Sequence, residues 1–246
     1  MIIFYGGAIA QFLFPRVAAL TAVARPSVLQ LPGLTVRGDS TPITIILLLT
    51  LLTLLPAILL SMTPFVRILI VFHFLRQALG TQTAPTNQTL IGLALFLTYF
   101  IMQPVGATVY TQSIVPFESG RVNIWGALDL ASGPVRSFML SYAREKDLAL
   151  FVEMSRAPRP QNAGDIPMRV VVPAYILSEL KTGFQIGAVL FLPFLVIDLV
   201  TASVTTSIGM LQLPPVVIST PLKILLFVVA DGWNLVVGSM LKSFHY

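Results

Sequence analysis

The chain has 246 residues, of which 56% are hydrophobic and only 10% are charged, whereas a soluble domain averages about 25% charged residues. This composition excludes an ordinary soluble globule and favours a protein of the bilayer or of a large apolar assembly. Cysteine is absent, which excludes disulfides and thiolate metal sites, and the net charge of +5 forms no basic run of the kind that binds nucleic acid.

The N-terminal segment has features of a targeting sequence. Arg16 precedes a short apolar run that ends in Ala22-Val23-Ala24, which has the form of a signal-peptidase site. Residues 1–24 are therefore either a signal peptide or an N-terminal anchor, and residues 25–42 form a linker.

Residues 43–112 predict a first apolar helical hairpin. The segment Ile43–Leu60 carries no charge and is long enough to span a bilayer. Ser61-Met62-Thr63-Pro64 should break or bend the helix. A second apolar piece, Phe65–Leu79, follows, and after a polar turn Leu90–Tyr110 forms the next span.

Residues 113–180 alternate acids with bases and predict a polar helical region. Within it, Phe138–Met154 has helical spacing of apolar residues and predicts one helix. Arg67 and Arg76 lie near the short connection before the second span, which places that connection in the cytoplasm. The polar region then lies outside the cytoplasm.

Residues 181–246 predict a second apolar hairpin with arms Phe184–Ile208 and Val216–Leu241, joined by a loop at 209–215 on the cytoplasmic side. The predicted fold class is therefore an all-α membrane-associated protein. It has about four long apolar helices in kinked hairpins, with a polar helical insertion between the second and the third.

Asp198 lies in the middle of an apolar arm, where an ionised acid is costly unless it is paired or faces water. Lys223 is the only base in the opposite arm. The mean of the two positions falls in the loop, so the two side chains should lie level in the hairpin and pair. The pair is either a structural ion pair or a polar point in a transport pathway.

Three further charges are candidate sites. Glu179 and Lys181 lie where the polar region meets the third apolar segment. They either begin a solvated helix or make contacts between subunits, with Arg67 or Arg76 as partners for Glu179. Asp231 interrupts the last arm and has no partner that the sequence identifies.

The loop residues Met210, Leu211 and Gln212 follow Gly209. Flexible methionine and leucine side chains fill irregular gaps, and hydrophobic constrictions can gate a pore. The alternative is a plain connection between two helices.

The sequence contains no nucleophile–base pair, metal motif, phosphate loop or paired carboxylates, which argues against an enzyme and predicts no cofactor. An alternative function is a small-solute or ion transporter or channel subunit, although the two halves show no internal repeat of the kind that transporters often have.

Several long motifs resemble the FliP/SctR family of type III secretion export-gate proteins, and they cover about residues 29–244. The motifs are Met62–Ile68, Leu75–Gln82, Pro85–Gln88, Ile91–Thr98, Ala143–Phe151, Glu179–Thr182, Phe184–Gly187, Ile197–Val200, Leu213–Pro215 and Asp231–Asn234. The stretches from Arg144 and from Asp231 are similar to the flagellar branch of the family.

The resemblance implies a core subunit of the flagellar export gate in the bacterial inner membrane, at the flagellar basal body. It implies a homopentamer that assembles with FliQ and FliR, helped by FliO, and that passes unfolded flagellar subunits. The family loop is often a run of methionines that seals the closed pore. Here Gln212 departs from that pattern.

Overall fold

The computed structural model describes residues 41–81, 83–155, 162–209 and 214–244. All regular elements in this part of the chain are helices, which confirms the predicted all-α fold class. The chain divides into two compact units between Thr50 and Leu51. Apart from the first ten residues of α2, the features discussed below lie in the second unit. The predicted targeting segment at 1–24 and the linker at 25–42 fall almost entirely outside the described residues.

The first apolar hairpin contains three helices. Helix α2 spans Thr41–Ser61, and α3 spans Phe65–Ala78 after the break predicted at Ser61–Pro64. Helix α4 spans Asn87–Val109 and is capped by Thr86, whose hydroxyl accepts the Thr89 N–H at 3.3 Å. Thr86 thereby satisfies one of the N–H groups that have no partner inside the helix.

Helix α4 continues without a break through a π-helical turn, η1 (Tyr110–Ile114), into α5 (Val115–Glu118). The run from Asn87 to Glu118 has 32 residues and is apolar and long enough to cross a bilayer.

The polar region forms two helices instead of the single predicted helix at Phe138–Met154. Helix α6 spans Ile124–Tyr142 and α7 spans Glu145–Met154. Ala143 and Arg144 between them are extended, with ψ of 132° and 138°. The Arg144 N–H donates to the Ser178 hydroxyl at 2.9 Å. A tertiary hydrogen bond thus replaces a helical one, which the periodicity of the sequence does not reveal.

Helix α8 is the longest helix of the described residues and spans Met168–Ser207, 40 residues. At 1.5 Å per residue it is about 60 Å long. It crosses the predicted domain boundary at 181 without interruption, so its polar start and its apolar end form one element. It ends at Ser207, and Gly209, with a φ of +79°, occupies the left-handed position after the helix.

The last two helices meet at a corner. Helix α9 spans Val216–Val229, α10 spans Gly232–Lys242, and their axes differ by 65°. Asp231 forms the corner with a left-handed φ of 49°. A Cβ on Gly232 would lie 2.2 Å from the Phe227 ring, so this position needs glycine.

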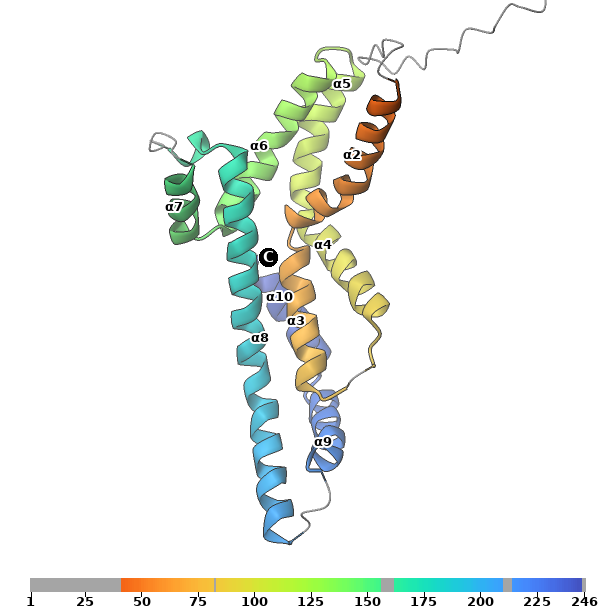
Figure 1. Cartoon of the computed structure of the whole chain (residues 1–246), viewed down its shortest axis with the longest axis vertical. Helices are drawn as coiled ribbons and strands as arrows, with labels where there is room; N and C mark the ends of the chain where they lie inside the picture. The colour runs from red at the N-terminus through yellow and green to blue at the C-terminus, as the bar shows by residue number, and fades with distance from the viewer. Residues whose placement is uncertain (1–40, 82, 156–161, 210–213, 245–246) are drawn as a thin grey trace, which may run out of the picture. The chain divides into compact units, whose positions relative to one another are not determined.

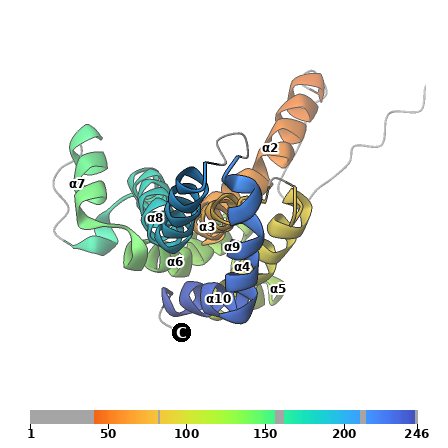
Figure 2. The same cartoon turned by 90° about the horizontal axis from the view of Figure 1, so that it is seen from below.

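Helix α3 forms the centre of the second unit and lies between α8 and α4 (Figures 1 and 2). Its fully buried side chains Ile68, Val71 and Phe72 pack with α4 residues and with Met240 and Phe244 from the end of the chain. The core thus brings the two predicted hairpins together around α3.

Candidate functional site

A buried ion pair connects α3 to α8. The Arg67 guanidinium donates from Nε to Glu179 Oε2 at 2.8 Å, and Nη2 donates to Glu179 Oε1. The two side chains are 4% and 1% exposed. Because both charges are removed from water, loss of either one would leave the other buried and unpaired. The pair therefore fixes how α3 lies along α8.

Arg67 is also covered by the end of the chain. Its guanidinium carbon lies 4.0 Å from the centre of the Phe244 ring, a cation–π geometry. Its Nη1 lies 3.2 Å from the Ser243 hydroxyl. The Tyr142 hydroxyl on α6 donates to the Phe244 carbonyl at 2.8 Å. These contacts hold the segment after α10 against α3 and α6.

The backbones of α3 and α8 approach closely over two glycines. A Cβ on Gly183 would lie 3.2 Å from Ile70, and one on Gly187 would lie 2.6 Å from the Phe74 ring. The two glycines are four residues apart, the small-xxx-small spacing that lets helices pack closely in membranes.

A second polar cluster attaches α7 to α8. Lys181 donates to Asp147, and the Ser178 hydroxyl donates to the other oxygen of Asp147 at 2.8 Å. Burial raises the pKa of Asp147, but the hydrogen bonds and the charges of Lys181 and Arg144 outweigh it and hold the pKa below its usual value. Asp147 therefore stays ionised at neutral pH.

A third ion pair connects α8 to α9. Lys223 Nζ donates to Asp198 Oδ2 at 2.5 Å, and the two residues lie level in the hairpin. The Lys223 side chain is only 5% exposed, while that of Asp198 is 39% exposed. The pair thus has one buried member and one member that reaches the edge of the hairpin.

The α8–α9 hairpin buries polar side chains and exposes apolar ones. Thr201, Thr205, Ser219 and Lys223 are all buried between or along the arms. The outward positions are aliphatic, and many are more than half exposed, among them Val196, Leu199, Val200, Val204, Val216, Val217, Leu225, Val228 and Val229. A hairpin with this arrangement is suited to apolar surroundings rather than to water.

The remaining predicted site residues lie apart from these pairs. Arg76 donates to Asn87 Oδ1 at 2.5 Å and holds the α3–α4 connection, whereas the Glu179 carboxylate pairs with Arg67 of the same chain. The Asp231 carboxylate accepts from Asn234 Nδ2 at 3.1 Å within the α9–α10 corner. Met210, Leu211 and Gln212 lie outside the described residues.

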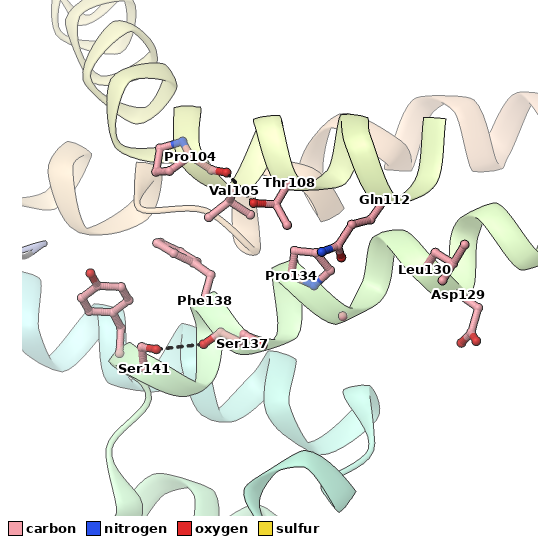
Figure 3. Close-up of a pocket in the computed structure, with 12 residues that line it drawn as sticks. Pro104, Val105, Thr108, Gln112, Asp129, Leu130, Pro134, Ser137, Phe138 and Ser141 are labelled. Atoms are coloured by element: carbon pink, nitrogen blue, oxygen red, sulfur yellow. Dashed lines mark hydrogen bonds between the residues drawn. The ribbon is translucent and has the colours of Figure 1, made fainter. Parts of the chain in front are cut away.

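A cavity of about 740 Å³ lies between α4–η1 and α6. Figure 3 shows Pro104, Thr108 and Gln112 on one wall, facing Pro134 and Phe138 on the other. Among the described residues that line it, Asp129 is the charged one. The described residues contain no group of three metal-ligating side chains, and this cavity contains no nucleophile paired with a base.

The sequence identified both members of the Asp198–Lys223 pair and left the partner of Glu179 open between Arg67 and Arg76, but it missed several residues of the site. Asp147 and Arg144 appeared only as parts of a charged region. Phe244 carried no signal at all. The spacing of Gly183 and Gly187 was a signal that could have revealed the close approach of α3 and α8.

The fold and the ion pairs define an all-helical, membrane-associated protein in which pairs of opposite charge join neighbouring helices. A sequence model described as the FliP family matches residues 48–240. The chain is 50% identical over 223 residues to the flagellar biosynthetic protein FliP of Pectobacterium carotovorum subsp. carotovorum, covering 88% of this chain and 86% of that protein. It is 49% identical to FliP of Bacillus subtilis strain 168, covering 83% and 93%.

The chain belongs to the FliP family of flagellar biosynthetic proteins. FliP of Caulobacter vibrioides is also 50% identical, over 80% of this chain and 74% of that protein. These similarities support a role in flagellar export and do not favour the transporter alternative. A structural component of an export gate is consistent with a protein that is not an enzyme.

Proposed function

We propose that this chain is a core subunit of the flagellar type III export gate, through which unfolded flagellar proteins cross the inner membrane. The family match over residues 48–240 is the observation that carries the proposal. The α8–α9 hairpin supports it, because its outward aliphatic side chains need lipid or neighbouring subunits around them.

About five copies of the chain would form a ring together with FliQ and FliR, and FliO would help assembly; this stoichiometry and these partners follow from the family resemblance. The three ion pairs are formed within one chain. Each subunit would therefore enter the assembly with these three pairs already formed. The exposed apolar faces of α8 and α9 remain for contacts with other subunits.

The experiment is complementation in a strain that lacks this chain. The intact chain should restore swimming and the release of flagellar subunits into the medium. Asp198→Asn should restore less of both, while Val196→Ile, a change at an exposed apolar position on the same helix, serves as the control. Normal export in the strain without the chain would contradict the proposal. A defect in solute uptake with normal flagella would favour a transporter.

We further propose that Met210, Leu211 and Gln212 form the pore constriction. Apolar side chains repeated around a ring would close the pore by excluding water. Replacing Met210 and Leu211 with Ala should let small solutes leak while the ring still assembles, because the loop adds little to the core. An intact ring without added leak would return this loop to a plain connection.

A further inference from the structure

A groove of about 410 Å³ separates the middle of α8 from α10. Helix α8 contributes Ile186, Val189 and Leu190, and α10 contributes Leu235 and Val236. Val189 and Leu235 are 67% and 62% exposed, so the groove is open along its apolar part. Helix α10 thus packs against its neighbours at its two ends, and an open groove separates its middle from α8.

The groove has one polar end. Helix α10 begins beside Phe227 and leads to Phe244, which lies beside Arg67. Its C-terminal half thus lies towards the Glu179 end of the groove, where Gln185 is the first lining residue on α8. Ser239, the polar lining residue of α10, lies towards this same end. The opposite end is lined by aliphatic side chains.

A cation lies next to the polar end, one hydrogen bond beyond the lining residue Gln185. Arg144 Nη2 donates to Gln185 Oε1 at 2.6 Å and to Thr182 Oγ1 at 2.9 Å, both neutral acceptors. The carboxylates that attract Arg144 electrostatically are already paired, Asp147 with Lys181 and Glu179 with Arg67. These five charged groups comprise three bases and two acids, so they leave one positive charge in surplus.

This level of α8 is also where the helix changes character. From Met168 to Thr182 it carries Arg169, Glu179 and Lys181, whereas Gly183–Ile197 has no charge at all. A cation at the boundary between a charged stretch and an apolar stretch lies where lipid headgroups meet hydrocarbon.

We propose that this groove binds one membrane phospholipid with an anionic headgroup, whose phosphate lies at Arg144 and whose acyl chain lies between α8 and α10. The volume is within the range of about 300–1,000 Å³ that is typical of ligand pockets. One turn of a helix about 10 Å wide and 5.4 Å long fills roughly 420 Å³. The groove therefore has room for about one helical turn, which suits a thin flexible chain better than a partner helix.

The test measures lipid that stays bound to the full chain, purified in mild detergent and exposed to equimolar vesicles of phosphatidylcholine and phosphatidylglycerol. Native mass spectrometry should show about one phosphatidylglycerol per chain in preference to phosphatidylcholine. Arg144→Gln should lower that preference about fivefold, since one cation near a lipid surface contributes about that much. Arg144→Lys should retain most of it.

A second variant tests the acyl site without changing a charge. Val189→Trp fills the groove and should abolish the bound lipid. Val196→Trp is the matched control, because Val196 is 56% exposed on the same helix and does not line the groove. Equal lipid on wild type and Val189→Trp, or no lipid on wild type, would overturn the proposal. If the wild type forms an oligomer without bound lipid and Val189→Trp dissociates that oligomer, the groove binds a second copy of the chain instead. None of these outcomes depends on the export function.

Discussion

The close approach of α3 to α8 makes a testable steric prediction. A Cβ on residue 187 would lie 2.6 Å from Phe74 Cγ and 2.7 Å from Cδ2, well inside ordinary contact distance. Overpacking of this kind costs about 1–3 kcal/mol. Alanine is the better helix former by about 1 kcal/mol, which offsets part of this cost. Gly187→Ala should therefore destabilise the chain by up to about 2 kcal/mol, and Gly187→Leu by more.

A matched control separates sterics from helix propensity. Gly92 lies inside α4 with nothing within 4 Å of its added Cβ, so Gly92→Ala should stabilise the chain by up to about 1 kcal/mol. The assay is the free energy of unfolding in mild detergent on titration with a denaturing detergent. Phe74→Ala should relieve part of the Gly187→Ala cost, with a coupling of about 1 kcal/mol. If Gly187→Ala behaves like Gly92→Ala, the packing described here is wrong.

Three further predictions concern the ion pairs. Glu179→Gln should cost about 3–5 kcal/mol in the same unfolding assay, because Arg67 stays charged and buried, and leucine at both positions should recover much of that loss. The double variant Asp198→Lys with Lys223→Asp should export better than either single change, and a double variant no better than the singles would argue against pairing. The loss caused by either single change should be smaller than for a fully buried pair, since the Asp198 side chain is 39% exposed. The depressed pKa of Asp147 means that its stabilisation is present above its usual pKa of about 3.9 and is lost as pH falls through the lower folded value. The stability difference between wild type and Asp147→Asn should thus be constant from about pH 7 to 5 and shrink only below about pH 4; a loss near pH 6 would refute this assignment.

The helices and their breaks were largely predictable from the sequence because apolar runs, prolines and glycines act locally. The break at Ser61–Pro64 and the end of α8 just before Gly209 are of this kind. The split between α6 and α7 was not predictable. It depends on a hydrogen bond from Arg144 to Ser178, 34 residues away in sequence.

The candidate site likewise contains residues that were predictable from the sequence and residues that were not. Asp198 and Lys223 could be matched because a hairpin relates their positions by simple geometry. Lys181 could not be matched to Asp147, because the polar region contains many acids and the sequence gives no reason to prefer one. Phe244 lies 177 residues after Arg67, and an aromatic residue near the end of a chain is no signal for a cation–π contact.

The charges of α8 explain how an apolar helix selects its neighbours. In an apolar environment, burial of aliphatic side chains does not distinguish one helix face from another, because lipid satisfies them equally well. A charge does distinguish, since it must find its counter-charge or remain costly. After Arg169, α8 carries three charges in its described residues, and each selects a different helix: Glu179 pairs with Arg67 on α3, Lys181 with Asp147 on α7, and Asp198 with Lys223 on α9. The order of these charges along α8 therefore fixes the level at which each helix packs, and apolar contacts such as those at Gly187 then bring the backbones together.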